Sequence, residues 1–276
     1  MEDNRLRAYL SEMIGTFALV LISAGAVVVS RMPGGLTPVS VSIALAAGLI
    51  YAGALAVVLP VSKGYLNPAL TIMLWVFKKM DGVQATALVL VQFLGSALAG
   101  FAVRFILSIG SDDVVQATRL GAPHLNFEAI GAAGVTLGPI LKGVGVELLL
   151  TFILAFVLYG LAFDPRAPRG VTRLLAVWLG IVLAAVTIVG APITGAAVNP
   201  ARWFGPALAE TTVPFLSSMR PFQDHAIYWI GPIAGALLGG WVYSALVLPA
   251  AEAEERAQAP ATVGSAAGST LFRAKR

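Results

Sequence analysis

The sequence predicts an all-α membrane protein with six transmembrane helices and two re-entrant half-helices in an inverted repeat. Three observations support this prediction. Hydrophobic residues make up 58% of the 276 residues and charged residues only 12%, about half the charged share of a soluble domain. Six stretches are long and apolar enough to cross a bilayer. The tripeptide Asn-Pro-Ala occurs twice, at residues 67–69 and 199–201, and each copy opens an apolar stretch that is too short to cross.

Composition also excludes several classes of protein. The chain has no cysteine, which excludes disulfides, thiolate catalysis and cysteine-bound metals. Its net charge of +4 is small, and the basic residues lie in scattered short loops, so we expect no nucleic-acid partner. Residues 1–7 have two acidic residues before the arginines, and no small-residue cleavage site follows. We therefore expect a retained first span after a short cytoplasmic stub, not a removable signal peptide.

The elements follow from the hydrophobic stretches and from the Gly- and Pro-rich gaps between them. The six predicted spans are residues 8–30, 40–60, 83–108, 142–163, 172–191 and 226–248, and the half-helices are residues 67–79 and 199–209. The predicted organisation is a stub at 1–7, a first repeat at 8–110, an extracellular connecting loop at 111–141, a second repeat at 142–248 and a disordered cytoplasmic tail at 249–276.

The two halves of the chain repeat one another. The first span contains Glu12 in EMIGT and the fourth contains Glu147 in ELLLT, and these glutamates precede Asn67 and Asn199 by 55 and 52 residues. Each half has three full crossings, so the second half must be inverted relative to the first. Non-helical backbone at membrane depth persists only where it is buried in protein or lines a wet cavity. The paired half-helices therefore predict an internal aqueous path.

The distribution of basic residues predicts the orientation of the bundle. Twelve lie on one side of it and four on the other. Lysine and arginine are enriched in cytoplasmic loops, so we expect both termini in the cytoplasm and a location in the plasma membrane. The larger set comprises Arg5, Arg7, Lys63, Lys78, Lys79, Arg166, Arg169, Arg173 and the four basic residues of the tail, and the smaller set comprises Arg31, Arg119, Lys142 and Arg220.

The tripeptides are suited to begin helices near the middle of the membrane. Asparagine is a good N-cap, and proline suits the first helical turn because its missing N–H is not needed there. Two facing helix starts, each with a partial positive charge, raise the barrier to cations and protons, while the asparagine amides can donate hydrogen bonds to a neutral solute. The predicted pore centre consists of Asn67, Pro68, Ala69, Asn199, Pro200 and Ala201.

Residues 8–248 resemble the aquaporin, or major intrinsic protein, family. The matching motifs are EMIGT, GYLNPALT, QFLGS, GAAVNPARWFGPAL and YWIGPIAGA. The doubled tripeptide with an arginine after its second copy is highly specific for this family. The resemblance implies six tilted spans with two half-helices, one pore in each subunit, and a homotetramer in the lipid bilayer. It also implies passage of water and small neutral solutes without a cofactor or a metal.

The resemblance further implies an outer selectivity filter. Arg202 follows Asn199 by three residues, and an intramembrane arginine is costly enough to indicate a functional site. As a fixed cation it can repel cations and orient a neutral solute. Spacing from the tripeptides carries the other three filter positions over to Ala47, Thr187 and Ala196. Water-specific members place an aromatic residue at the first of these and a histidine at the second. This chain is therefore more similar to members with wide filters, which pass glycerol, urea, or boric, arsenous or silicic acid.

Other positions resemble water channels instead. Glycerol-conducting members usually have an aspartate directly after the filter arginine, where this chain has Trp203. They also tend to replace an aromatic pair that is present here as Tyr228 and Trp229. We give the filter residues more weight for solute size, because they would touch the solute whereas Trp203 and Tyr228 would serve packing.

The remaining polar residues have structural interpretations. Glu12 and Glu147 could form a proton relay, but we expect each carboxylate to accept backbone N–H bonds from a half-helix loop, as the resemblance implies. His124 and His225 lie in loops without the partner spacing of a metal site, and we expect His124 to be solvated. Spaced small residues indicate close helix packing; they are Gly95 with Ala99 and Gly235 with Gly239.

The sequence thus predicts a passive channel for water and small neutral solutes, with a wide outer filter, that excludes protons and ions. One alternative is a strictly water-selective channel. Another is a secondary active transporter, since inverted repeats also build transporters, but outside the two glutamates no titratable group lies in the predicted path. A membrane enzyme is not supported, because no nucleophile–base pair or metal-ligand cluster occurs at usable spacing.

Overall fold

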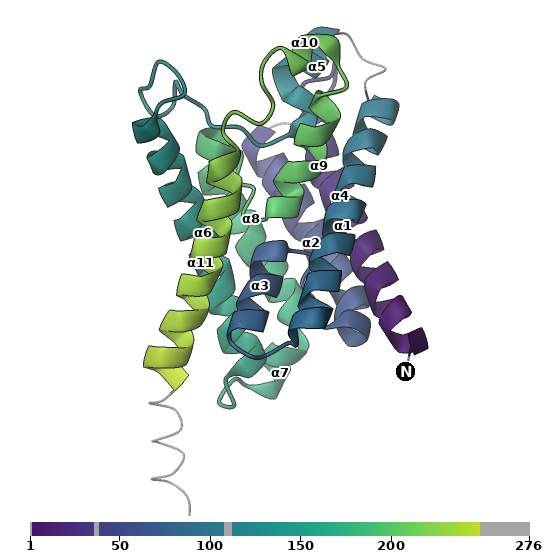
Figure 1. Cartoon of the computed structure of the whole chain (residues 1–276), viewed down its shortest axis with the longest axis vertical. Coiled ribbons are helices and arrows are strands. Elements are labelled where there is room, and N and C mark those ends of the chain that lie inside the picture. Colours follow the sequence, from purple (N-terminus) through teal and green to yellow (C-terminus); the bar gives the residue numbers. More distant parts are fainter. Residues whose placement is uncertain (1, 36–38, 108–111, 249–276) are drawn as a thin grey trace, which may run out of the picture.

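In the computed structural model of the chain, residues 2–35, 39–107 and 112–248 are described. They form a bundle in which long helices run side by side along the vertical axis of Figure 1. We call the two ends of this bundle the lower and the upper end, as they are drawn there; the chain begins at the lower end (Figure 1). The predicted tail at 249–276 lies outside the described residues.

Six described helices are long and apolar enough to cross a membrane, which confirms the six predicted spans. They are α1 (Glu2–Val29), α2 (Val39–Ser62), α4 (Gly82–Leu107), α6 (Leu137–Phe163), α8 (Leu175–Thr194) and α11 (His225–Val242), which continues into the π-helical turn η2 (Tyr243–Val247). Helix α1 already includes residues 2–7, the predicted stub, and α6 begins ahead of the predicted start at residue 142.

Two short helices begin at the tripeptides: α3 (Pro68–Val76) and α9 (Pro200–Glu210). Helix α3 runs towards the lower end of the bundle and α9 towards the upper end (Figure 1). Their N-terminal ends therefore face each other midway, where the positive ends of the two helix dipoles meet. The other short elements lie outside the spans; they are α5 (Asp112–Thr118), the 3-10 turn η1 (Arg119–Gly121), α7 (Arg169–Arg173) and α10 (Pro214–Ser217).

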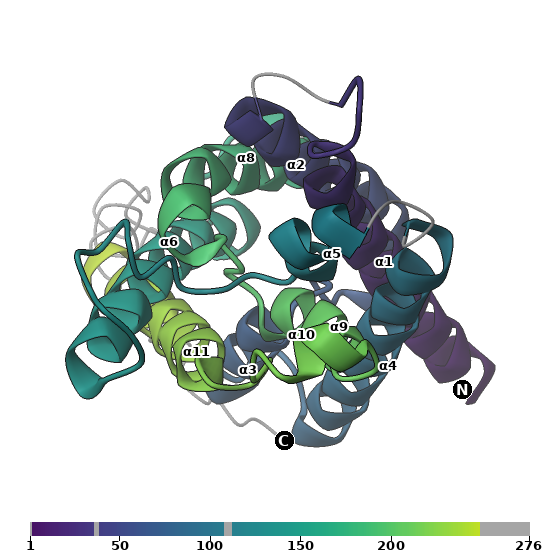
Figure 2. The ribbon, with the colours of Figure 1, turned by 90° about the horizontal axis from the view of Figure 1, so that it is seen from above.

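The contacts between helices recur in the two halves of the chain. Helix α1 packs against α4 as α6 packs against α11, and α2 packs against α8. Each half-helix reaches the other half, because α3 contacts α11 and α9 contacts α4. Figure 2 shows both half-helices in the gap between α11 and α4. This exchange is the arrangement of an inverted repeat.

Small residues let the paired helices approach backbone to backbone. A Cβ atom on Gly95 of α4 would collide with the carbonyl of Met13 in α1, and one on Gly235 of α11 would collide with the carbonyl of Leu148 in α6. These contacts confirm the packing role predicted for the two glycines. They fix the distance between the helices that hold the half-helices.

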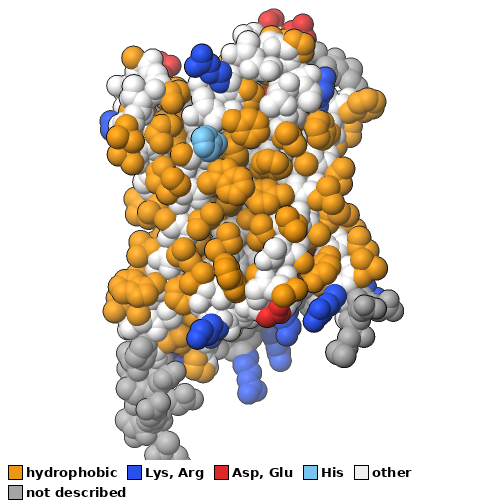
Figure 3. All heavy atoms as spheres, viewed as in Figure 1, with side chains coloured by type: hydrophobic (Ala, Val, Ile, Leu, Met, Phe, Trp, Pro, Cys, Tyr) orange, Lys and Arg blue, Asp and Glu red, His pale blue; other side chains and the backbone are white. Residues whose placement is uncertain are grey.

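The surface of the bundle suits a lipid environment. Figure 3 shows hydrophobic side chains over the middle of one face, with lysine and arginine side chains at its lower end. Large apolar side chains are exposed on all six spans, among them Leu49 and Phe105, which are 71% and 87% exposed. A continuous apolar surface of this kind is unfavourable in water and favourable against lipid. The chain is therefore a multi-pass membrane protein.

Candidate pore and outer filter

The two tripeptides meet inside the bundle and join the half-helix loops to each other. Asn67 Nδ2 donates a hydrogen bond to the carbonyl of Val198 (2.9 Å), and Asn199 Nδ2 donates one to the carbonyl of Leu66 (2.8 Å). Each asparagine Oδ1 also accepts the backbone N–H two residues further on, at 2.9 Å, and so caps its half-helix. Each side-chain amide has a second N–H group, which can donate a hydrogen bond to an oxygen atom of a solute.

The loop before α3 is strained and is held by a buried carboxylate. Leu66 has a positive φ of 55°, which costs an L-residue roughly 1–2 kcal/mol. Glu12, which is fully buried, accepts hydrogen bonds from the N–H of Leu66 (3.0 Å), the hydroxyl of Ser62 (2.6 Å) and the side-chain amide of Gln92 (2.7 Å). These three bonds fix the turn that presents the carbonyl of Leu66 to Asn199.

The loop before α9 is built in the same way. Ala196 and Val198 have positive φ angles of 46° and 45°. The fully buried Glu147 accepts hydrogen bonds from the N–H groups of Ala197 (2.9 Å) and Val198 (2.7 Å) and from the hydroxyl of Thr194 (2.6 Å). The two glutamates therefore hold matching loops of the inverted repeat. Neither of them lines the cavity described next, which disfavours a proton relay along it.

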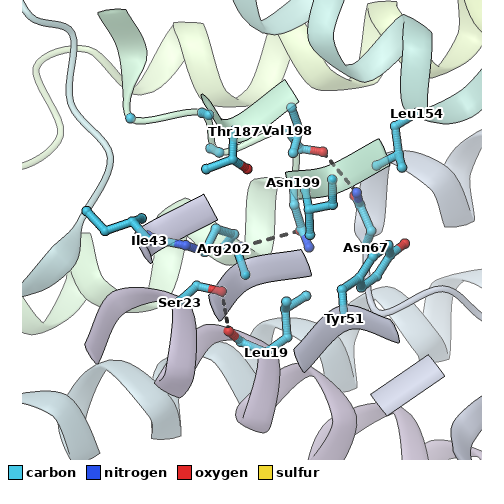
Figure 4. A pocket seen from close by; sticks show the side chains of 15 residues that line it. Leu19, Ser23, Ile43, Tyr51, Asn67, Leu154, Thr187, Val198, Asn199 and Arg202 are labelled. Carbon is cyan, nitrogen blue, oxygen red and sulfur yellow. Dashed lines mark hydrogen bonds between the residues drawn. The ribbon is translucent and has the colours of Figure 1, made fainter. Parts of the chain in front are cut away.

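Next to the asparagines the bundle encloses a narrow cavity (Figure 4). The volume open to the centres of water molecules is about 20 Å³, which is room for one or two waters. Its wall is formed by α1, α2, α6, α8, the loop before α9 and the first turn of α9. Asn67 and Asn199 are part of this wall. A solute in the cavity therefore lies within reach of both amides.

Arg202 projects into this cavity from the first turn of α9. The residue is only 7% exposed, and its Nη1 donates a hydrogen bond to the carbonyl of Gly121 at 2.9 Å. Its backbone N–H donates to Asn199 Oδ1 at 3.3 Å. A guanidinium has five N–H donors, so the anchored side chain retains donors for a solute.

The structure brings the four predicted filter positions together. Ala47 of α2, Thr187 of α8, Ala196 of the loop before α9, and Arg202 all line the same cavity. The hydroxyl of Thr187 is buried and has no hydrogen-bond partner among the described residues. A buried hydroxyl normally has a partner, so the Thr187 hydroxyl is suited to bind a polar solute next to Arg202 (Figure 4).

Several side chains beside the filter were not predicted from the sequence. On α2 they lie one turn before and one turn after Ala47, and on α8 one turn before Thr187. Residues four apart on a helix share a face, so the row through each filter position is the signal that would have found them. The additional lining side chains include Leu19, Ser23, Ile43, Tyr51, Leu154 and Leu183.

The aromatic residues that resemble those of water channels do not line the cavity. Trp203 and Tyr228 are fully buried and stack on each other, with ring centroids 5.4 Å apart and planes 13° apart. The hydroxyl of Tyr228 donates to the carbonyl of Thr194 at 2.8 Å. Trp203 and Tyr228 therefore support the filter by packing and by holding the loop before α9, without contacting the lumen.

His124 is not a solvated loop residue, so that prediction is wrong. Its side chain is 11% exposed, and its ring nitrogens lie 2.7 Å from Glu210 and 3.2 Å from Asp224. These partners follow it by 86 and 100 residues, so no local pattern could reveal them. His225 is exposed. In the part of the chain that the structure describes, no group of three or more His, Cys, Asp and Glu side chains could hold a metal ion.

Fold and site together define a polytopic membrane protein of the channel class, with paired half-helices and a cavity beside them inside a single chain. The profile of the Major intrinsic protein family matches residues 2–243, and the chain belongs to this family. Its members are passive channels and not enzymes.

Individual relatives agree with this assignment. Aquaporin TIP4-4 of Zea mays is 35% identical over 247 residues, which cover 88% of this chain and 87% of that protein. The probable aquaporin AqpM of Archaeoglobus fulgidus is 31% identical, over 87% of this chain and 96% of that protein. The X-ray structure of the aquaglyceroporin from Plasmodium falciparum matches with a TM-score of 0.75 and 19% identity, over 90% of this chain and 99% of that one. This last similarity shows a common fold.

Proposed function

We propose that the channel passes water and small neutral solutes such as glycerol, urea or boric and arsenous acid down their gradients. The observation that supports this most is the composition of the cavity wall at Ala47 and Thr187, which line it together with Arg202. A methyl and a small hydroxyl at these positions leave more room than an aromatic ring and an imidazole. The free Thr187 hydroxyl and the guanidinium provide hydrogen bonds for a polyhydroxyl solute or an amide.

Exclusion of ions is part of the same proposal. The positive ends of α3 and α9 face the lumen centre, and Arg202 adds a fixed positive charge beyond them. A cation would lose its hydration in a cavity with room for one or two waters and meet these charges without compensation. A neutral solute avoids both costs.

A strictly water-selective channel is the competing candidate, and one observation favours it. The cavity volume is small, and Leu19 and Ile43 also line it. Their side chains take part of the space that the methyl of Ala47 leaves free. The largest solute that can pass then depends on the mobility of these aliphatic side chains as well as on the four filter positions.

Stopped-flow light scattering on proteoliposomes distinguishes the two candidates. We expect glycerol and urea permeabilities well above those of protein-free vesicles, together with a low temperature dependence of water flux. The double variant Ala47→Phe/Thr187→His should lose glycerol permeability by about tenfold or more while retaining most of its water permeability. Leu90→Phe, which adds a ring at an exposed position of α4, is the matched control and should change neither.

Each contrary outcome of this experiment has a defined meaning. Fast water flux without glycerol or urea permeability in the unmodified protein would establish strict water selectivity. Solute rates that saturate, or that need an ion gradient, would favour a secondary active transporter. That alternative has little support, because the buried glutamates are outside the cavity wall.

Orientation and assembly complete the proposal. We propose that both termini are cytoplasmic in the plasma membrane, on the basis of the twelve basic residues on one side against four on the other. We also propose a homotetramer, on the basis of the family resemblance. Protease protection of a C-terminal tag in right-side-out vesicles tests the first, and the mass of the detergent-solubilised protein tests the second.

A further inference from the structure

Four charged side chains converge above the filter from separate segments. Arg119 of η1 donates to Glu210 of α9 through Nη2 (2.6 Å) and Nε (3.2 Å). His124 Nε2 lies 2.7 Å from Glu210 Oε1. His124 Nδ1 lies 3.2 Å from both carboxylate oxygens of Asp224, at the start of α11. We call Arg119, His124, Glu210 and Asp224 the outer charge cluster. Both carboxylates are essentially buried.

The geometry of the cluster favours a protonated histidine. A neutral imidazole has one N–H donor, whereas an imidazolium has two, and here each nitrogen faces a carboxylate. Burial alone would lower the pKa of His124, but its hydrogen bonds to Asp224 and Glu210 and their negative charges outweigh burial and raise the pKa above its ordinary value of 6.5. With His124 protonated, two cations and two anions balance within the cluster.

The cluster fixes the segment that anchors the filter arginine. Gly121, whose carbonyl accepts the hydrogen bond of Arg202, lies between Arg119 and His124 in the chain. The backbone N–H of Leu125 also donates to Asp224, at 2.9 Å. The segment is thus held on both sides of Gly121.

The backbone of residues 119–121 adopts an unfavourable conformation that depends on contacts with the rest of the protein. Arg119, Leu120 and Gly121 have positive φ angles of 48°, 53° and 74°, and the first two are unfavourable for L-residues. Gly121 lies so close to α1 that a Cβ atom there would collide with the backbone of Ala24. Loss of a cluster contact would therefore let the segment relax and move the carbonyl that positions Arg202.

We propose that His124 is a positioning residue for the filter. Protonated His124 holds residues 119–125 in place and, through Gly121, also holds the guanidinium of Arg202. Deprotonation of His124 loosens this segment, so that solute selectivity changes with pH. This rests on the proposed filter role of Arg202. Deprotonation leaves a ring lone pair facing a carboxylate. His124 Nε2 is 2.7 Å from Glu210 and Nδ1 is 3.2 Å from Asp224, so we expect the longer contact, between His124 and Asp224, to be the one that opens.

The surroundings of His124 are formed by η1, α9, α11 and α1. The charged groups that face His124 are Glu210 from α9 and Asp224 from α11, and Arg119 from η1 reaches it through Glu210. The hydroxyl of Tyr228 of α11 donates to the backbone carbonyl of Thr194 and makes no hydrogen bond to His124. The neighbouring wall of α1 at Ala24 carries no charge.

The chain contains only two histidines, which makes a direct test practical. In His225→Gln, which replaces an exposed residue, the imidazole nitrogen resonances of the labelled protein report on His124 alone. We expect a titration midpoint above 6.5, with both nitrogens protonated below it. Asp224→Asn in this background should lower the midpoint by about one pH unit, because a negative neighbour is removed.

The functional arm measures the ratio of glycerol to water permeability between pH 5.5 and 9. In His225→Gln we expect the ratio to rise roughly twofold or more through the midpoint found by the titration. In His124→Gln/His225→Gln the ratio should no longer depend on pH. A midpoint at or below 6.5, or the same pH profile with and without His124, would overturn the inference.

The two proposals fail in different ways. If the filter assignment is wrong, Ala47→Phe/Thr187→His will leave the solute preference unchanged, while the titration of His124 can still behave as expected. If only the present inference is wrong, that variant will change the solute preference but the pH profile will not follow His124. The titration in His225→Gln leaves the cluster intact, so the test does not depend on whether cluster variants fold.

Discussion

Arg202 places a positive charge in the wall of a cavity with room for one or two waters. Its Nη1 is anchored on the carbonyl of Gly121, and its backbone is fixed by the cap that Asn199 provides. The neighbouring Thr187 supplies a hydroxyl that has no hydrogen-bond partner in the described part of the chain, and Ala47 and Ala196 supply only methyl groups. At the scale of single residues, the proposed filter combines one polar side with small side chains and does not rely on an aromatic ring.

Replacement of Arg202 by valine should raise the leak of cations and protons. Two charges 4 Å apart interact by about 4 kcal/mol at an effective dielectric constant of 20, so loss of the guanidinium should increase leak by roughly tenfold or more. Potassium and proton flux into proteoliposomes measure this. Arg104→Gln is the control, because Arg104 lies in the last turn of α4 and does not line the cavity. An unchanged leak in Arg202→Val would mean that the half-helix dipoles alone exclude cations.

At the scale of elements, the half-helices exist because three devices act together. The asparagine caps start each helix, the exchanged asparagine bonds join the two loops, and the glutamates hold strained turns. Lipid offers no hydrogen-bond partners to the asparagine amides, the glutamate carboxylates or the loop backbone. These polar groups therefore depend on the spans that surround them and keep them out of contact with lipid.

Glu147→Gln tests the structural interpretation of the buried glutamates. Ala197 and Val198 donate to different oxygens of Glu147. An amide has one acceptor oxygen, and its NH2 group would face one of these two N–H groups, so we expect a loss of roughly 2–3 kcal/mol of stability. The thermal unfolding midpoint in detergent and the water permeability should both fall. A variant that keeps its stability but loses proton-dependent transport would instead indicate a relay.

The glycine contacts between spans allow a matched pair of substitutions. Gly235→Ala would place a methyl group against the carbonyl of Leu148 and should cost about 1–3 kcal/mol. Gly145→Ala lies on α6, where a Cβ meets nothing within 4 Å, and should be neutral or stabilising by up to roughly 1 kcal/mol. Thermal unfolding of both variants measures the difference. Equal effects would contradict the close-packing argument.

At the scale of the whole molecule, the cavity is lined from both halves of one chain, by α1, α2, α6, α8 and the two half-helix loops, and it lies inside the bundle of that chain. Subunits of an oligomer should therefore conduct independently. In vesicles with mixed oligomers of unmodified and Ala47→Phe/Thr187→His subunits, we expect glycerol permeability to fall in proportion to the fraction of the variant. A steeper than linear loss would show that subunits share a path or a gate.

Stability of the whole molecule should also depend on the outer charge cluster. The pKa of His124 is raised in the folded protein. Its stabilising contribution is then present in full below its unfolded pKa of about 6.5 and is lost as pH rises through the folded value. We expect the unfolding midpoint of His225→Gln to fall over that interval relative to His124→Gln/His225→Gln. Parallel curves for the two proteins would contradict this.

The sequence by itself determined the fold to an unusual degree. Low charge content and long apolar stretches decide the spans. In lipid, the backbone N–H and C=O groups of such a stretch need hydrogen-bond partners, and a helix supplies them within the stretch itself. Repetition of Glu12 and Asn67 as Glu147 and Asn199 decides the inverted repeat. Spacing from the tripeptides, carried over from the family resemblance, also selected four residues that line one cavity, Ala47, Thr187, Ala196 and Arg202.

Only the tertiary structure decided which other side chains share the lumen and what holds the filter. Ile43 and Leu183 line the cavity because of how α2 and α8 are rotated, and rotation depends on packing with all neighbouring helices. His124 meets Glu210 and Asp224 across 86 and 100 residues, a distance at which sequence pattern has no periodicity to follow. Burial and ion pairing of this kind arise from contacts between distant segments, so they become visible only once the chain is folded.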